Sequence, residues 1–198
     1  MFAPIFGARR TFIACAMAFL IAPSLSVSGD APFSAAASSI VTSLNQQALP
    51  LVNAETLDTA ALENVLDAHT DIDSVLKRAL KRQWRSLSDT QLTELKAQTL
   101  TLVGRAYTSA MKGVDSKNIA YKAKRSKPTS ARVGTTVAKD ASNIQVDYRL
   151  RRRDTGWKVV DVIISGVSIV AVYSADFEGV LTHKGVNGLI AALRKRNS

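Results

Sequence analysis

Cysteine and histidine are scarce in this sequence. Among 198 residues there is one cysteine, Cys15, and there are two histidines, His69 and His183. Cys15 lies in a leader segment that we expect to be removed, and neither histidine stands in an HxxxH or HExxH pattern. A disulfide, a thiol nucleophile and a Cys-ligated zinc site would then be excluded from the mature chain, and we expect no metal site.

Long hydrophobic runs are also lacking beyond the N-terminus. Two arginines precede an uncharged, apolar stretch over residues 11–22, and small residues follow up to Gly29. This order predicts a cleaved signal peptide over residues 1–29, with Val27 and Gly29 at the cleavage site and residues 35–37 as a second option. Because residues 11–22 are too few to span a bilayer, we expect an exported, soluble protein.

Acidic residues are outnumbered by basic ones. The chain has 16 Asp and Glu against 26 Lys and Arg, a formal net charge of +10, and loss of the signal peptide with its two arginines would leave +8. An exported basic protein meets anionic lipid head groups more readily than nucleic acid. Aromatic residues are not interleaved with the basic ones, so we expect no nucleic-acid partner.

Apolar periodicity divides the remaining chain into a helical half and a strand half. We predict one domain over residues 38–198, preceded by a flexible segment over residues 30–37. Apolar side chains at helical spacing predict four helices in the first half. The expected helices cover residues 38–49, 56–68, 71–83 and 88–113. Pro50 is expected to end the first, and Ser88 with Gln91 forms a capping box at the start of the fourth.

After Gly113 the apolar period changes to two, which predicts β-strands. The expected strands cover residues 119–124, 132–137, 144–151 and 157–165. In the last of these strands, apolar residues occupy both the odd and the even positions, so we expect it to be covered on both faces. Short turns make the sheet an antiparallel meander, and helices over residues 169–181 and 186–196 follow Gly166. The predicted class is α+β, with a four-stranded antiparallel sheet wrapped by helices.

Motifs of catalysis are not found. The sequence contains no GxSxG, P-loop or GxGxxG pattern. Asp147, Tyr148 and Asp161 lie on adjacent predicted strands, where acids and a tyrosine on a curved sheet could transfer protons. The favoured alternative is that Asp147 is solvated and that Asp161 pairs with a nearby arginine. We therefore assign no catalytic residue and do not expect an enzyme.

Basic residues gather in two runs on the predicted strands. The runs are Lys122, Lys124, Arg125 and Lys127, and Arg149, Arg151, Arg152 and Arg153. They could form a patch for anionic lipid or for an acidic partner, or a solvated edge that discourages aggregation. The strand order of a meander does not by itself force the two runs together.

One face of the predicted sheet is apolar and meets long apolar stripes on the helices. Tyr121, Val133, Val146 and Tyr148 share this face with part of the fourth strand. The two layers could close as an ordinary core or leave a gap that holds an acyl chain, and periodicity does not separate these alternatives. The pattern alone favours a solid core.

Two stretches of sequence carry a resemblance to a known family. The first is LKRQWRSLSDTQL from Leu80, followed by Tyr107. The second is GWKVVDVIISGVSIVAVYSADF from Gly156, followed by GVNGLIAAL from Gly185. Together they resemble the toluene-tolerance (MlaC) family, over roughly residues 38–196.

Three positions depart from the family pattern. Lys81 replaces a glycine and Leu95 replaces a phenylalanine, which we interpret as packing changes. Ser174 replaces an arginine after Tyr173, which could alter a contact with a partner or a lipid head group. The ligand and partners could therefore differ from those of other members.

The resemblance implies a periplasmic phospholipid carrier with an apolar cavity between sheet and helices. It would exchange phospholipid with an inner-membrane Mla-type ABC transporter complex and an outer-membrane lipoprotein complex, and so maintain outer-membrane lipid asymmetry. Phospholipid is then cargo, no cofactor or covalent chemistry is implied, and we expect a monomer. Inward parity gives the expected tail contacts, which are Tyr107, Tyr121, Val133, Val146, Tyr148, Val160, Val162 and Ile164.

Three alternatives accompany this interpretation. Some relatives are associated with hopanoid synthesis, so the ligand could be a polycyclic lipid. A non-transporting adaptor with a solid core would carry no lipid. The third alternative is an enzyme that uses Asp147, Tyr148 or Asp161. Identification of the bound lipid would separate the first two from a phospholipid carrier, and replacing both acids would test the third.

Overall fold

The computed structural model describes residues 31–198, with side chains from Phe33 onward. The predicted signal peptide over residues 1–29 lies outside the described residues.

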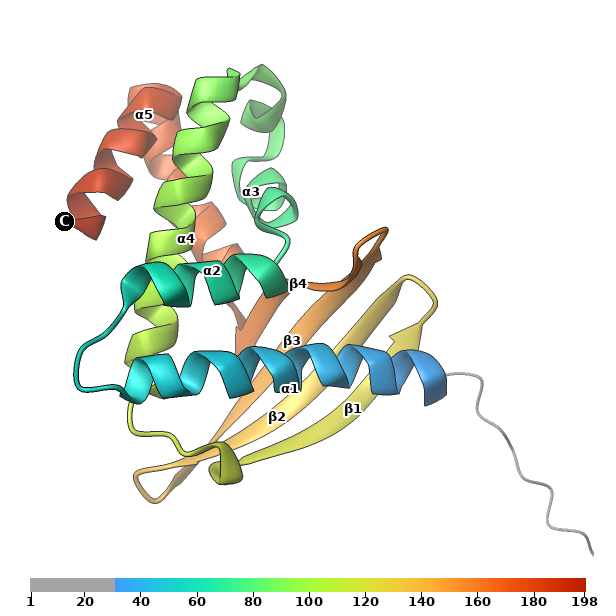
Figure 1. The fold of residues 1–198 in the computed structure, drawn as a ribbon. Coiled ribbons are helices and arrows are strands. Elements are labelled where there is room, and N and C mark those ends of the chain that lie inside the picture. The colour runs from blue at the N-terminus through green and yellow to red at the C-terminus, as the bar shows by residue number, and fades with distance from the viewer. Residues whose placement is uncertain (1–30) are drawn as a thin grey trace, which may run out of the picture.

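The α+β class is confirmed, because five α-helices pack with one antiparallel sheet (Figure 1). The elements follow in the order α1 (Ala31–Asn53), α2 (Thr59–His69), α3 (Ile72–Leu80), η1 (Lys81–Ser86), α4 (Asp89–Met111), η2 (Ser116–Asn118), β1 (Ile119–Lys127), β2 (Ser130–Lys139), β3 (Ser142–Arg153), β4 (Gly156–Ile164), β5 (Val167–Ser168) and α5 (Ile169–Asn197). None of the helices in this part of the chain is long and apolar enough to cross a membrane.

The sheet is an antiparallel meander in the order β1-β2-β3-β4-β5. Four long strands agree with the prediction, and the fifth corrects it, because the sequence predicted only four. The two residues of β5, Val167 and Ser168, pair with Ile164 and Ile163 after a turn at Gly166. A strand of two residues is too short to show an alternating pattern in the sequence.

Helix α1 begins earlier and ends later than predicted. Residues 31–37, expected in a flexible segment, form its first turns, because Ala37 is fully buried and extends the apolar stripe of the helix. Pro50 lies inside the helix instead of ending it. The helix continues to Asn53, whose side-chain amide donates to the Val114 carbonyl at 2.9 Å and so anchors this end.

Side-chain caps fix the starts of the helices beside the sheet. Asp71 caps α3 by accepting a hydrogen bond from the Ser74 amide at 2.9 Å. The capping box predicted for α4 is confirmed. Ser88 Oγ accepts from the Gln91 amide at 3.2 Å, and Gln91 Oε1 accepts from the Ser88 amide at 3.1 Å.

The helices form two groups around the sheet. Helices α1 and α2 lie across one face, here called the inner face, whereas α3, α4 and α5 stand together beside β4 (Figure 1). Each group has its own core: Leu66 and Val133 belong to the first, and Leu76 and Leu95 belong to the second. Helix α5 is kinked at Gly185, where φ is 62°, in agreement with the two helical segments predicted there.

Candidate functional site

A small apolar pocket lies where the two cores meet. Its volume is about 160 Å³, and it is enclosed by the inner face of β3 and β4 and by the helices. The sheet contributes Val146, Tyr148, Val159, Val162 and Ile164 to its wall. The helices contribute, among others, Leu76, Ala79, Val103, Tyr107, Tyr173 and Phe177. We call this cavity the apolar pocket.

Five of the eight predicted tail contacts line the apolar pocket. They are Tyr107, Val146, Tyr148, Val162 and Ile164. These residues come from α4, β3 and β4. The choice of positions expected to face inward therefore picked side chains from three elements that the fold brings together.

Two of the other predicted residues lie on the same inner face but not in the pocket. Val133 is buried in the core beneath α1, and Tyr121 is half-buried on β1. Parity determines which face of a sheet a side chain occupies, whereas its distance from the pocket depends on which strand carries it. The pocket lies at the β3–β4 side, so residues of β1 and β2 do not reach it.

Val160 is the third predicted residue that does not line the pocket. It lies on the opposite side of the sheet because of a β-bulge. In the pairing of β3 with β4, Arg149 lies opposite Asp161. The next residue, Leu150, lies opposite Val159, which leaves Val160 as the extra residue. A bulge of this kind interrupts the strict alternation of faces, and the apolar pattern of β4 does not reveal it.

Asn45 on α1 connects two tyrosines on the inner face, close to Tyr148. Tyr107 donates to Asn45 Oδ1 at 2.9 Å, and Asn45 Nδ2 donates to the Tyr121 hydroxyl at 3.2 Å. Burial raises the pKa of Tyr148 to about 12 and also raises the pKa of Tyr107 above its usual value. The sequence prediction missed Asn45, although a polar residue in the apolar stripe of a helix is a signal that could have found it.

Two aromatic residues of α5 were also missed as pocket residues. Tyr173 and Phe177 line the pocket, and their ring centroids are 6.0 Å apart in a stacked arrangement. Both stand in the family-like stretch, one helical turn apart. Their spacing places them on one face of α5.

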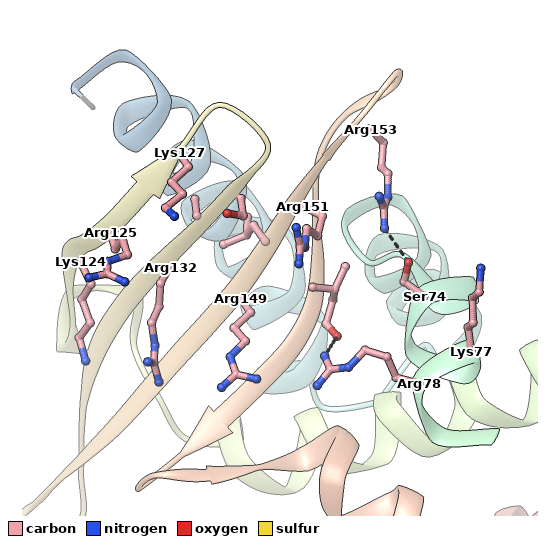
Figure 2. A pocket seen from close by; sticks show the side chains of 14 residues that line it. Ser74, Lys77, Arg78, Lys124, Arg125, Lys127, Arg132, Arg149, Arg151 and Arg153 are labelled. Carbon is pink, nitrogen blue, oxygen red and sulfur yellow. Dashed lines mark hydrogen bonds between the residues drawn. The ribbon is translucent and has the colours of Figure 1, made fainter. Parts of the chain in front are cut away.

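A larger cavity lies on the outer face of the sheet, opposite α1 (Figure 2). Its volume is about 740 Å³, with α3 at one side. Nine cationic side chains line it, namely Lys77, Arg78, Lys124, Arg125, Lys127, Arg132, Arg149, Arg151 and Arg153. The two basic runs therefore do meet, because β1 and β3 are separated only by β2, which places them about 10 Å apart. We call this cavity the basic groove.

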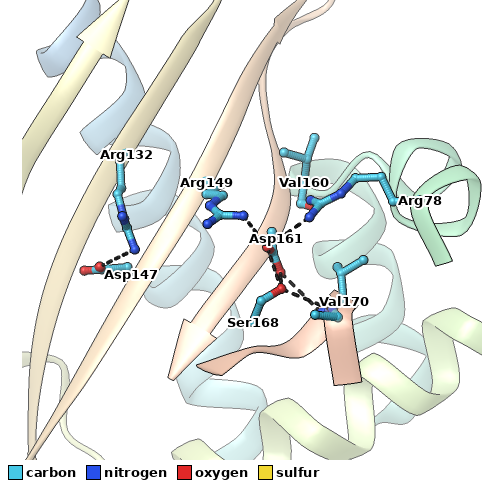
Figure 3. A network of polar contacts seen from close by, with 9 residues as sticks. Arg78, Arg132, Asp147, Arg149, Val160, Asp161, Ser168 and Val170 are labelled. Atoms are coloured by element: carbon cyan, nitrogen blue, oxygen red, sulfur yellow. Dashed lines mark hydrogen bonds and ion pairs between the residues drawn. The ribbon is translucent and has the colours of Figure 1, made fainter. Parts of the chain in front are cut away.

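Asp147 is held between two cations of the basic groove. Its Oδ1 lies 2.6 Å from Lys124 Nζ. Its Oδ2 lies 3.0 Å from Arg132 Nη2 (Figure 3). Only 12% of the Asp147 side chain is exposed. The expectation that Asp147 is solvated was therefore wrong, because its neighbours across β1 and β2 cover and neutralise it.

Asp161 is the centre of a buried polar network, and its predicted pairing with arginine is confirmed. Its carboxylate lies 3.2 Å from Arg149 Nη1 and 3.4 Å from Arg78 Nη2 (Figure 3). It also accepts hydrogen bonds from Ser168 Oγ at 2.8 Å and from the Val170 amide at 3.3 Å. The side chain of Asp161 is fully buried, so this one carboxylate joins α3, β3 and the start of α5 to β4.

Asp71, the cap of α3, pairs with a further groove cation. Burial by itself would raise the pKa of Asp71, but hydrogen bonds from Ser74 and Arg153 outweigh it and hold the pKa below its usual value. Arg153 Nε lies 2.7 Å from the carboxylate. Asp71 therefore stays ionised and fixes α3 to the end of β3.

The three residues considered for proton transfer do not form one site. The carboxylates of Asp147 and Asp161 contact cations of the basic groove, whereas Tyr148 lines the apolar pocket on the inner face. Between Phe33 and Ser198, no group of three or more His, Cys, Asp or Glu side chains is arranged to hold a metal ion. Asp147, Tyr148 and Asp161 therefore do not assemble into a proton-transfer site.

A family model described as MlaC protein matches residues 34–195. The chain belongs to the MlaC family. One solved structure similar to it is a phospholipid-binding protein from Ralstonia solanacearum in complex with a phospholipid. That structure has a TM-score of 0.70 and 24% identity, and the match covers 81% of this chain and 96% of that chain. The likeness supports the fold described above. None of the curated proteins compared with the chain matches it.

One departure from the MlaC family pattern has a conformational meaning. Lys81, where the resemblance leads us to expect glycine, adopts φ 52° and ψ −118° at the end of α3. Residues with a side chain rarely adopt this conformation, and glycine adopts it readily. The change is therefore one of backbone strain, not of packing as expected from the sequence.

Proposed function

We propose that this MlaC-family protein is an exported carrier that binds phospholipid acyl chains in the apolar pocket. The observation that carries the proposal is the wall of that pocket, which is almost entirely apolar and is built from both cores. The phospholipid complex of the Ralstonia protein supports the choice of ligand. The carrier would be a monomer and would need no cofactor.

The pocket must widen to admit an acyl chain. Its volume of about 160 Å³ is close to that of a cavity that holds benzene, and it is below the roughly 300–1,000 Å³ of ordinary ligand sites. Helices α3, α4 and α5 pack on one another in a separate core, so α3 and α5 would move away from the sheet together, and the ion pairs of Asp71 and Asp161 would have to open. The conformation described here is then the closed one.

Acyl-chain burial supplies the free energy for this opening. Each methylene removed from water contributes about 0.8 kcal/mol, so ten buried methylenes contribute roughly 8 kcal/mol. Binding of this strength makes spontaneous release slow. A partner that stabilises the open conformation would therefore release the lipid, and we propose an inner-membrane ABC transporter complex and an outer-membrane lipoprotein complex in this role.

Native mass spectrometry of the protein purified from the periplasm, followed by lipid extraction, tests the proposal. A stoichiometric phospholipid adduct is the expected result. A polycyclic lipid in its place would assign the protein to hopanoid transport. The bare polypeptide mass, together with no uptake from labelled vesicles, would indicate an adaptor with a solid core and would refute the carrier.

Filling the pocket gives a second test. Val162→Trp should lower the phospholipid content several-fold, because the indole would occupy the wall that faces the helices. Val167→Trp is a matched control, since Val167 is 55% exposed and lies outside the pocket. Equal phospholipid content in the two variants, both folded by circular dichroism, would place the acyl chains elsewhere.

A further inference from the structure

We infer that the basic groove docks the protein on anionic membrane surfaces by binding the phosphate groups of their lipids. This inference goes beyond the proposed carrier function, since the groove lies on the opposite face of the sheet from the apolar pocket. It assigns a role to the two basic runs that lipid binding in the pocket leaves unexplained.

The groove carries more positive charge than its own acids neutralise. Five of its nine cations pair with Asp71, Asp147 and Asp161. Nine cations against these three carboxylates leave a surplus of six positive charges. Among the described residues no acidic side chain pairs with the other four cations, which are Lys77, Arg125, Lys127 and Arg151.

The local backbone is shaped to display these cations. The pairing of β1 with β2 shifts register between Ala123 and Arg125, so Lys124 is the extra residue of a bulge and lines the groove. Its side chain crosses β2 at Gly134, where an added Cβ would lie 2.5 Å from Lys124 Cε. Nearby, the Nε donor of Arg132 is buried and has no acceptor among the described residues.

The lining favours a membrane surface over a protein or a nucleic acid. Among the described residues that line it there is no aromatic side chain, and the apolar ones are Ala131, Leu150 and Val160. Protein partners usually need a buried aromatic or aliphatic anchor, and single-stranded nucleic acids need stacking platforms. Guanidinium groups match phosphate in a planar, two-point geometry, and six of the nine cations are arginines.

The position of the groove also suits a surface. Lys127, Arg151 and Arg153 lie near the end of the sheet at which the β1–β2 and β3–β4 hairpins turn (Figure 2). Lys127 and Arg151 are exposed there, so they can approach a flat layer of head groups without moving the fold.

The test is co-sedimentation with vesicles of phosphatidylglycerol and phosphatidylcholine at about 0.1 M salt. The double variant Lys127→Glu/Arg151→Glu alters exposed residues for which the structure gives no ion pair, so folding should be retained. Each cation near an anionic surface contributes roughly fivefold to partitioning, so we expect binding to fall by about 20-fold or more. The matched control, Arg82→Glu/Lys184→Glu, makes the same charge change outside the groove and should lose less than about threefold.

Equal losses in the two double variants would overturn the inference, because net charge alone would then explain binding. Binding of polyglutamate but not of the vesicles would overturn it in favour of an acidic protein partner. Binding of inorganic phosphate at millimolar concentration, with no binding of the vesicles, would overturn it in favour of free phosphate. Phospholipid content by native mass spectrometry should be unchanged in the groove variant, which keeps this test separate from that of the carrier.

Discussion

The inner and outer faces of the sheet use neighbouring residues of the same strands for opposite chemistry. On β3, Val146 and Tyr148 line the apolar pocket, whereas Asp147 and Arg149 between and beside them form ion pairs outside. The inner cavity is small and apolar, and the outer one is several times larger and cationic. Alternation along a strand is thus sufficient to place two unrelated sites a single sheet thickness apart.

The difference lies in how each face is stabilised. The inner face depends on packing, in which tolerance for a changed volume is limited. The outer face depends on three carboxylates that hold five cations in place and leave four unpaired. Asp161 belongs to both, because its carboxylate pairs with groove arginines while its residue also borders the apolar pocket.

Replacing Asp161 should have the largest effect of the changes considered. Asp161→Ala leaves Arg78 and Arg149 without their buried partner and frees Ser168 at the start of α5. We expect a loss of about 3 kcal/mol in the free energy of unfolding, measured by urea denaturation. Asp67→Ala, at an exposed position on α2, is the control and should change it by less than about 0.5 kcal/mol. A loss below about 1 kcal/mol for Asp161→Ala would show that the network does not join the two faces.

Tyr148 tests the inner face through pH. Its folded-state pKa of about 12 exceeds the unfolded value of about 10, so the unfolded state releases the proton first as pH rises. The contribution of this hydroxyl to stability is fully present below pH 10. It is lost as the pH rises from 10 to about 12, and the total loss is roughly 2–3 kcal/mol. Tyr148→Phe should therefore lose less stability than the wild type across this window in urea titrations. Identical pH profiles for the two proteins would contradict the burial of this hydroxyl.

Strands β3 and β4 show which part of the inner site the sequence predicts and which part it does not. Alternation along β3 assigned Val146 and Tyr148 to the correct face, because a regular strand has a strict period of two. The same rule misplaced Val160, since a bulge in β4 interrupts the period without changing the apolar pattern. Asn45 and Phe177 reach the pocket region from helices whose positions over the sheet depend on tertiary packing.

The outer site was visible in the sequence only as its parts. The two basic runs, which contain Lys127 and Arg151, can be read directly from the sequence. Whether they lie side by side depends on the strand register and on the single strand, β2, that separates them. The contribution of Arg78 from α3 could not be predicted, because periodicity does not tell which face of a helix borders a given strand. Hairpin register and helix docking are set by the whole fold.

Gly134 offers a smaller change, confined to the outer face. Gly134→Ala would place a Cβ 2.5 Å from Lys124 Cε and 3.0 Å from Asp147 Oδ1, so the lysine must leave its ion pair. We expect a loss of about 1 kcal/mol by thermal denaturation. Gly179→Ala, in a helix with nothing within 4 Å of the added Cβ, should instead gain up to about 1 kcal/mol. A gain in both variants would show that the lysine does not depend on the crossing at Gly134.

The smallest effect is expected at the end of α3, the helix that borders both cavities. Lys81 adopts φ 52° and ψ −118°, and its only ion pair, to Glu178, is more than half exposed on both sides and contributes little. Lys81→Gly should therefore raise the free energy of unfolding by about 0.5–1 kcal/mol, because the relief of strain exceeds the entropy lost by glycine on folding. Lys81→Ala removes the same ion pair but keeps the Cβ, so it should bring no gain. If the two variants were equally stable, the strain would not lie in this backbone.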